Sequence, residues 1–432
     1  MTSTREPNPL SRRAFVRLAL ATAPAAALAA CAAEPTAQSA PSPTASTPTP
    51  TSTSTPTIGS PAALSARPAV IRSFGPNGTH WPSHTPWVGE TIPKVVEVAC
   101  SWSAIATAIK AVTSSQAAAG VHITVRPGTL PGVGASSGST AVLQNVGNAA
   151  WTKNVLVSPR DGWGTVKIGD AARLRDVRGV TFARIDGTDV LLTNCTRTAW
   201  AQSKMSKGLR MASSYGATTT GCGAYEIVMS GAKADIADPL GYAAGKGCVI
   251  KDCVWEGCYC APVFRPTGAD DHVDSLQMYG SGWYRGLTVR DTTFFGSLNC
   301  ALQIGGMRTD DPNKGTPFLT VDHCILTSQA TAMRVRYPKP SNADTPKLTQ
   351  AINGIGEPGQ LHAKDSYIFG SMYRSQWGTV SNTRVSYADA ASRNPVASGR
   401  WTVDTGMDSW TAADFDRLTP TPTDAYLKKI WS

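Results

Sequence analysis

A tetrapeptide that recurs six times is the feature that most limits how this chain can fold. Each copy has an aliphatic or small residue, a polar residue, then Asn, Asp or His, and then Cys, Thr or Ser. The copies begin at Leu192, Ile250, Val289, Val321, Ala363 and Val380. In a straight strand the first and fourth residues lie on opposite faces, so a bend must intervene if both point inward.

The third residue of each copy has a type that suits such a bend. Asn, Asp and His tolerate the left-handed backbone conformation that makes a one-residue corner. The six third-position residues are Asn194, Asp252, Asp291, His323, Asp365 and Asn382. We predict a corner at each of them and assign them a structural role.

Strands with alternating apolar and polar residues follow several of these corners. They are predicted at Ser275–Tyr279, Ala301–Gly305 and Ala332–Arg336, with an earlier member at Leu209–Met211. Strand, corner, strand and loop in repetition describe a coil of stacked parallel strands. A single elongated solenoid then accounts for 432 residues, a length at which a compact chain normally divides into domains.

The start of the folded region predicts a cap for this coil. Ser101–Ala119 carries Ile105, Ile109 and Val112 at helical spacing, and a strand-like segment, His122–Val125, follows Gly120. A helix at this place would cover the open end of the coil, which otherwise exposes a sheet edge.

With this cap and the run Arg126-Pro127-Gly128-Thr129, residues 95–400 resemble the right-handed parallel β-helix superfamily of pectate lyases. The resemblance implies an all-β fold, a right-handed parallel β-helix solenoid with an N-terminal capping helix. It also implies a carbohydrate-binding groove on the outer face of one strand column. The comparable positions here hold Gln277, Gln303 and Arg334 instead of Asp, which argues against the calcium site and the pectate specificity of those lyases.

Residues 1–30, at the amino terminus, are predicted to be an export signal peptide. Ser11–Arg17 resembles the twin-arginine signal, and the apolar stretch Leu18–Ala30 is too short for a permanent membrane helix. Leu28–Cys31 resembles a bacterial lipobox, which predicts lipidation of Cys31 after cleavage. An ordinary signal peptide that happens to contain a Cys is the alternative.

A Pro/Thr/Ser-rich segment, residues 31–68, is predicted to be a disordered tether between that lipid and the β-helix domain of residues 69–432. We therefore expect a monomer held at the outer face of the cell membrane after export by the twin-arginine route. The net charge is +10, and +7 remains after the first 31 residues, which carry four Arg and one Glu. This surplus suits an acidic partner.

The candidate site lies where the longest insertion, Glu256–Val273, enters the strand that carries Gln277. It ends in Asp270-Asp271-His272-Val273-Asp274, the densest group of ionisable residues in the chain. Gln277, Gln303 and Arg334 are predicted to form one outward column with Tyr279 and Arg336 beside it. Trp283, just beyond the strand, offers a flat face on which a sugar ring can stack.

Two chemistries could use this site on an extracellular polysaccharide, and we expect β-elimination first, with hydrolysis as the alternative. In β-elimination, Arg334 and Arg336 would bind a sugar carboxylate, a Ca²⁺ on Asp270, Asp271 and Asp274 could do the same, and His272 or Tyr279 would move protons. In hydrolysis, two carboxyl groups such as Asp271 and Asp274 would act as acid and base or nucleophile.

A binding module without catalysis is the third alternative for the same face. Gln277 and Gln303 could form a purely structural amide ladder, and Asp270 and Asp271 could be solvated turn residues. Beyond the site, a tail from Ala412 to Trp431 is apolar enough to dock and is predicted to close the far end of the coil. The segment from Gly75 to Val88 is predicted to pack along the coil.

Several function classes lack sequence support. The chain has no Gly-rich phosphate loop and no His-Glu-x-x-His helix, and its basic residues are scattered, which argues against nucleic acid binding. Cys248, Cys253, Cys258 and Cys260 do not have the paired spacing of a zinc site and are predicted to be buried apolar residues.

Overall fold

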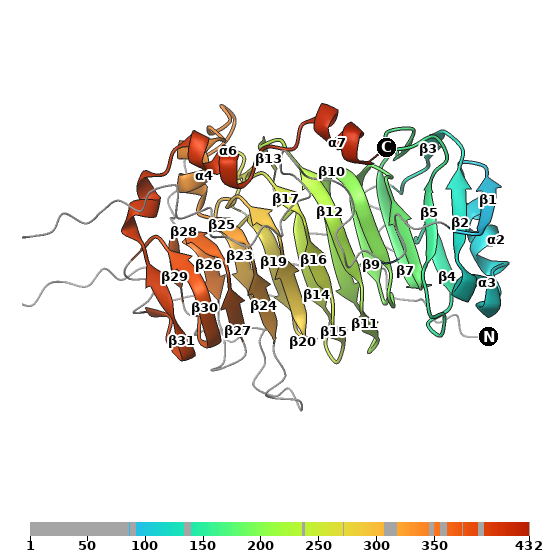
Figure 1. The fold of residues 1–432 in the computed structure, drawn as a ribbon, viewed down its shortest axis with the longest axis horizontal. Helices are drawn as coiled ribbons and strands as arrows, with labels where there is room; N and C mark the ends of the chain where they lie inside the picture. Colours follow the sequence, from blue (N-terminus) through green and yellow to red (C-terminus); the bar gives the residue numbers. More distant parts are fainter. Residues whose placement is uncertain are drawn as a thin grey trace, which may run out of the picture.

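The computed structural model describes residues 86, 92–133, 140–235, 238–270, 272–305, 318–344, 350–354, 361–373, 375–387 and 393–431. Cys31, the expected signal peptide and the expected linker lie outside these residues. Within them, parallel strands stack along one long axis (Figure 1). This is the right-handed parallel β-helix that the corner pattern predicts.

One column of strands, which we call the bent sheet, runs the whole length of the coil. Several of its strands contain a left-handed corner residue or are interrupted by two residues at the corner, and neighbouring strands pair in parallel register. The members are β1 (Lys94–Val98), β2 (Val121–Val125), β5 (Val155–Pro159), β8 (Val180–Ala183), the first half of β10 (Ala199–Ser213), β12 (Gly223–Met229), β16 (Val254–Glu256), β17 (Tyr259–Cys260), β21 (Leu287–Arg290), β22 (Thr293–Phe294), β24 (Leu319–Asp322), β25 (Ile325–Thr327), β27 (Leu361–Lys364), β28 (Tyr367–Phe369), β30 (Trp377–Val385) and β31 (Val396–Val403).

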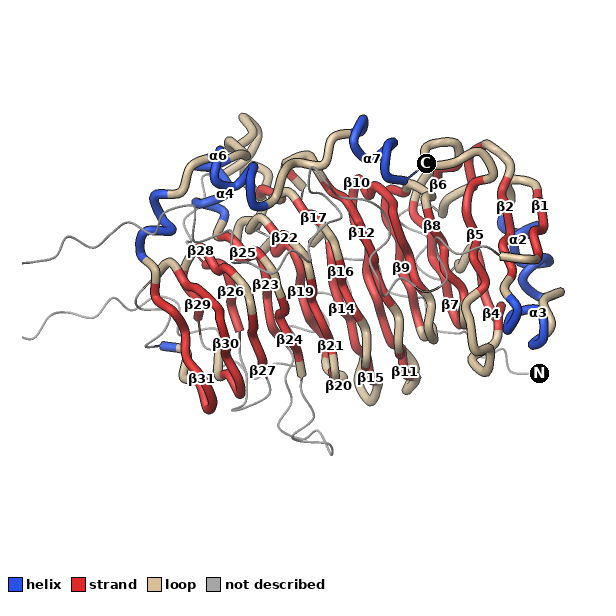
Figure 2. Tube along the Cα trace, in the orientation of Figure 1, coloured by secondary structure: helices blue, strands red, loops and turns tan. Residues whose placement is uncertain are grey.

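A second column, the straight sheet, forms another wall of the coil (Figure 2). It consists of β4 (Leu143–Gly147), β7 (Ala171–Arg178), β9 (Gly187–Thr193), the second half of β10, β14 (Leu240–Ala244), β19 (Asp274–Gly280), β23 (Cys300–Ile304), β26 (Gln350–Gly354) and β29 (Ser371–Tyr373). Smaller parallel groups are β11 (Thr218–Thr220) with β15 (Val249–Lys251) and β20 (Trp283–Arg285), β13 (Lys233–Ala234) with β18 (Val263–Phe264), and β3 (Gly128–Leu130) with β6 (Val166–Ile168).

All six predicted corner residues have a left-handed backbone, with φ between 42° and 56°. The strand register places them in three columns. Asn194 stands beside Asp176 at the end of the straight sheet, and Asp252 stands between Gly221 and Gly286. The remaining four form one column in the bent sheet. Two side-chain hydrogen bonds link that column, from Asn382 Nδ2 to Asp365 Oδ1 at 2.7 Å and between His323 Nδ1 and Asp291 Oδ1 at 2.8 Å.

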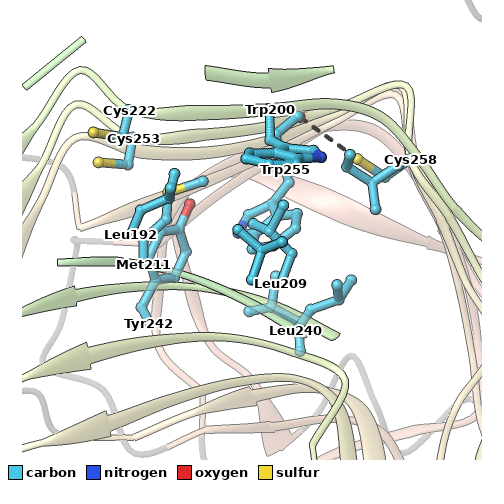
Figure 3. Close-up of a cluster of buried hydrophobic side chains, with 14 of the residues drawn as sticks. Leu192, Trp200, Leu209, Met211, Cys222, Leu240, Tyr242, Cys253, Trp255 and Cys258 are labelled. Carbon is cyan, nitrogen blue, oxygen red and sulfur yellow. Dashed lines mark hydrogen bonds between the residues drawn. The ribbon is translucent and has the colours of Figure 1, made fainter. Parts of the chain in front are cut away.

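The interior of the coil is filled by stacked apolar side chains from successive coils (Figure 3). Trp200 stacks on Phe182 with ring centroids 5.1 Å apart, and Cys222 and Cys253 lie side by side in the close-up. Nine cysteines lie in the described residues, and eight of them are buried. The predicted burial of the four cysteines between 248 and 260 is therefore confirmed.

The N-terminal cap consists of two helices, α2 (Trp102–Lys110) and α3 (Ser114–Ala119). The sequence predicted one helix over this range, but Thr113 and Gln116 form a reciprocal capping box that starts a second helix. Ile105 and Ile109 of α2 are fully buried, as predicted.

The C-terminal segment does not close the far end of the coil, contrary to prediction. After β31, it runs back along the outside of the bent sheet through η4 (Thr405–Ser409), α6 (Ala412–Leu418) and α7 (Asp424–Trp431), and α7 lies beside β10 (Figure 1). The apolar outward side chains of the bent sheet explain this course, because Phe295 and Phe369 pack against Phe415 of the segment.

The opposite flank of the bent sheet is covered from the amino-terminal side. Ile92 packs on an outward cluster around Tyr225, and Thr181 Oγ1 donates to Pro86 O at 3.0 Å. Pro86 is the described residue of the predicted arm and contacts the coil, while the rest of residues 75–88 lies outside the described part, so the course of the arm stays a prediction. No helix in the described ranges is long and apolar enough to cross a membrane.

Candidate functional site

The straight sheet presents a row of outward side chains, one from each coil. Gln277 of β19 pairs in register with Gln303 of β23, as predicted, and Gln303 pairs with Asn353 of β26. Asn353 Nδ2 donates to Gln303 Oε1 at 2.8 Å. All three amides are partly exposed, so they give this face a line of donors and acceptors.

Two carboxyl groups lie one above the other at the entrance to this sheet. The register of β14 and β19 puts Asp238 beside Asp274 on the next coil, where neighbouring strands are about 4.8 Å apart. The backbone N–H of Asp274 donates to Asp238 Oδ1 at 2.7 Å. Asp274 is fully buried, whereas Asp238 is partly exposed. We call these two residues the carboxyl stack.

Burial and the like charge of the neighbour both favour the protonated form of this stack. Burial raises the pKa of Asp274 to about 6, against the opposing hydrogen bonds from Cys300 and Asn299. Burial, and then the charge of Asp274, raise the pKa of Asp238 well above its usual range. The stack therefore holds a proton to a higher pH than an ordinary carboxyl group does, and it can donate that proton.

Donors from the next coil fix the orientation of Asp274. Asn299 Nδ2 and Cys300 Sγ each lie 2.9 Å from Asp274 Oδ1, and Gln277 Nε2 lies 3.3 Å from Oδ2. Asn299 also donates to Gln303 Oε1 at 3.0 Å. Because these bonds join the stack to the amide row, the two form one connected polar surface.

His272 lies at the mouth of this surface. Its side chain is exposed, and its charge is among the effects that lower the pKa of Asp274. Asp274 and Gln277 are in hydrogen-bond contact, and the roles assigned to them and to His272 stay predictions. Asp271 lies outside the described residues, so its catalytic assignment stays a prediction.

A pair of arginines, which the sequence reasoning missed, extends the row on earlier coils. Asp189 accepts from Arg173 Nη2 at 3.1 Å and from Arg210 Nη2 at 2.9 Å. Arg173 and Arg210 are 14% and 13% exposed in their side chains. Asp189 lies between the two guanidinium groups, and Asp238 of the carboxyl stack is close enough to Arg210 for their charges to interact. The alternation Ala172-Arg173-Leu174 and Leu209-Arg210-Met211 was the available signal.

Arg334 and Arg336 do not belong to the site, contrary to prediction. The expected strand Ala332–Arg336 is occupied by helix α4 (Gln329–Val335), which Ser328 caps by accepting from Thr331 N at 3.1 Å. Arg334 Nη1 donates to Trp410 O, and Arg336 binds Asp416 Oδ1 at 2.6 Å. Both arginines therefore hold the C-terminal segment.

The two predicted aromatic residues lie on different surfaces. Tyr279 is two residues beyond Gln277 on the same strand, and its ring lies near Gly241 and Arg210. Trp283 lies beyond the turn, in β20, with the Arg285 guanidinium 5.9 Å from its ring centroid. Only Tyr279 thus adjoins the amide row.

Among the residues that the structure describes, no three His, Cys, Asp or Glu side chains are grouped so that they could hold a metal ion. Asp270 is exposed. Since Asp271 is not described, a calcium site on Asp270, Asp271 and Asp274 stays a prediction.

Comparison with known proteins gives distant structural neighbours. No protein-family model and no curated protein matches the chain. A PL6-family polysaccharide lyase from Pseudopedobacter saltans matches with a TM-score of 0.30 and 12% identity, over 67% of this chain and 65% of that one. The catalytic domain of a GH87 alpha-1,3-glucanase in complex with tetrasaccharides matches with a TM-score of 0.26 and 9% identity, over 74% and 67%. Likeness at this level assigns no activity, so the proposal below rests on the site itself.

Proposed function

We propose that this protein is an exported, lipid-anchored enzyme that cleaves an acidic extracellular polysaccharide on the outer face of the straight sheet. The carboxyl stack is the observation that carries the proposal. A carboxyl group with a raised pKa, in a partly exposed position beside a row of amides, is suited to protonate a glycosidic oxygen.

Hydrolysis is the reaction that this arrangement supports best. Asp238 is the exposed member of the stack and would donate its proton to the leaving oxygen, while Asp274 beneath it keeps that proton in place by its own charge. His272 is the exposed neighbour that could accept a proton from the attacking water. Elimination is less well supported. It was expected to use Arg334 and Arg336 to bind the sugar carboxylate, but these arginines bind the C-terminal segment.

The substrate class follows from the charge on the same face. Arg210 and Arg173 lie on this face with Asp189 between them, so an acidic group of the glycan could approach their guanidinium groups. The amides of Gln277, Gln303 and Asn353 match sugar hydroxyl groups, which both donate and accept hydrogen bonds. The lipid anchor on Cys31 and export by the twin-arginine route rest on the sequence alone and complete the proposal.

The full-length chain in detergent, incubated with a panel of acidic and neutral polysaccharides, tests the proposal. New reducing ends are expected from an acidic polysaccharide. Asp238→Asn should lower kcat by about 10²-fold or more with little change in KM. Asp365→Asn, the same chemical change at a distant corner, is the matched control and should keep full activity.

Three results would decide against parts of this proposal. New reducing ends accompanied by an unsaturated product would indicate elimination. Binding without any cleavage would indicate a passive glycan-binding module. The assigned substrate class would be wrong if the wild type turned over neutral and acidic polysaccharides equally and the Arg210→Ala variant did the same.

A further inference from the structure

A second polar row lies on the bent sheet, away from the carboxyl stack. Arg184, Gln202 and Glu226 occupy the same corner position on three successive coils, in register through β8, β10 and β12. Arg184 Nε donates to Gln202 Oε1 at 3.1 Å, and Gln202 Nε2 donates to Glu226 Oε2 at 2.8 Å. We call these three residues the corner row.

The corner row departs from the pattern of the other corners in its column. All three residues are left-handed, with φ of 61°, 47° and 51°. The following coils place Gly257, Asp291 and His323 at this position, and such types tolerate the conformation better than long side chains do. Strained residues of this kind cluster at binding sites, where the surrounding structure holds them.

The end of helix α7 lies against the corner row. Gln202 and Glu226 are fully buried, and Trp431 at the end of α7 donates from Nε1 to Glu226 Oε2 at 2.9 Å. The Trp431 ring meets Trp163 edge-on, with centroids 5.3 Å apart. Trp163 Nε1 in turn donates to Asp186 Oδ1 at 2.8 Å. A flat aromatic ring of the protein's own tail thus sits between a carboxylate and another aromatic ring.

The two halves of the C-terminal segment are held in different ways. The half around α6 packs an aromatic cluster, in which Phe415 lies 4.8 Å from Phe369 between centroids. Helix α7 has eight residues, of which Leu427, Ile430 and Trp431 are buried. Its ion pair from Lys204 to Asp424 is solvent-exposed and of little energetic value. A helix this short is stable only while it is packed, so weakening its contacts would release α7 and leave the contacts of α6 in place.

We propose that α7 is a removable cover over a second binding site, the corner row with Trp163, which takes a neutral saccharide chain. Guanidinium, amide and carboxylate groups in line offer both donors and acceptors to hydroxyl groups, and the Trp163 ring offers a face for stacking. The indole of Trp431 fills this place in the covered form. The inference does not depend on catalysis at the carboxyl stack, because its measure is binding.

Removal of the cover by mutation in the full-length chain tests the inference. Calorimetric titration with laminaripentaose, cellopentaose and chitopentaose measures binding, and hydrogen exchange at β10 and β12 measures detachment. Trp431→Ala should speed exchange at the corner row and raise the affinity for at least one of these sugars by about tenfold or more, since covered molecules cannot bind. Lys429→Ala, on the exposed side of α7, is the matched control and should behave as the wild type.

A second pair of variants separates a binding site from a merely structural ladder. Glu226→Gln in the Trp431→Ala background should remove the gain in affinity. Asp424→Lys weakens the cover by repulsion from Lys204 and leaves Trp431 in place, so it should give a smaller gain in sugar affinity. This variant replaces Trp431→Ala if that protein does not fold. Faster exchange at β12 without any gain in affinity, in either cover variant, would overturn the inference.

Discussion

Asp274 shows how a single buried carboxyl links the site to the stability of the fold. Its pKa rises from the ordinary 3.8 to about 6, so the native state binds this proton more tightly than the unfolded chain does. The stabilisation is therefore present below pH 4 and is lost as the pH rises through about 6. For this fully buried group, the difference in pKa between the native and the unfolded state corresponds to about 3 kcal/mol in the free energy of unfolding.

Asp274→Asn should remove most of this pH dependence. The variant keeps an oxygen for Asn299 and carries no charge, so its free energy of unfolding at about pH 8 should exceed that of the wild type by about 1–3 kcal/mol. Chemical denaturation at about pH 4 and pH 8 measures this. If the free energies of unfolding of variant and wild type differed equally at both pH values, the Asp274 carboxyl would not be the source of the pH dependence.

Asp252 tests the left-handed corner at the level of one residue. Its side chain is exposed, so the backbone conformation dominates the effect of a substitution. Asp252→Val should lower the free energy of unfolding by about 1–2 kcal/mol, whereas Asp252→Gly should be nearly neutral. Lys251→Ala, at an exposed extended position next to it, is the control. A Val variant as stable as the Gly variant would contradict the assigned conformation.

Single residues were predictable where backbone geometry restricts the residue type. The corners could be read because few side chains accept a left-handed conformation, whatever surrounds them. Asp238 could not be read in this way, because its partner Asp274 is 36 residues away and only the register of β14 and β19 joins them. Arg173 and Arg210 likewise meet only through the register of β7, β9 and β10.

At the scale of the element, helix α4 shows where a short pattern misleads. The alternation in Ala332–Arg336 fits a strand, but five residues also fit one helical turn, and Ser328 supplies the N-cap that decides for the helix. Arg334 and Arg336 contact the C-terminal segment, which is far away in the sequence, so no local sequence pattern indicates these contacts. The same reason explains why the course of α6 and α7 was predicted wrongly.

Arg336→Ala should therefore loosen the C-terminal segment and leave the site unaffected. The variant loses the contacts of Arg336 to Tyr259, Thr419 and Asp416, so hydrogen exchange in α6 should become faster and the melting temperature should fall. KM for a polysaccharide substrate should change by less than about twofold. Arg384→Ala, a partly exposed arginine paired with Asp404, is the control. A large rise in KM would restore Arg336 to the site.

At the scale of the whole molecule, the architecture could be predicted because each coil repeats the same local requirements. The site could be predicted only in part, since it arises where inserted loops meet the straight sheet. Both covered flanks belong to the bent sheet, which the arm at Ile92 and the C-terminal segment overlie. The partly exposed amides of the straight sheet thus mark the face on which a ligand can lie.

The proposed anchorage is tested on the whole protein in a bacterium with twin-arginine export. Cys31→Ser should move the protein from the membrane fraction to the soluble exported fraction, because no acyl chain can be attached. Replacement of Arg12 and Arg13 by Lys should retain it inside the cell. Fractionation and the mass of the amino-terminal peptide measure both effects. A Cys31→Ser protein that stays with the membrane would contradict lipidation at that residue.

The register between successive coils has a consequence for how such a molecule can change in length. Each corner residue of the bent sheet stands above its counterpart, as His323 does above Asp291, so an excision between two counterparts removes one complete turn. The two new neighbours would meet with matching hydrogen-bond partners and matching interiors. Duplication or loss of whole turns is then a route by which a lineage could lengthen or shorten the ligand track without rebuilding either end.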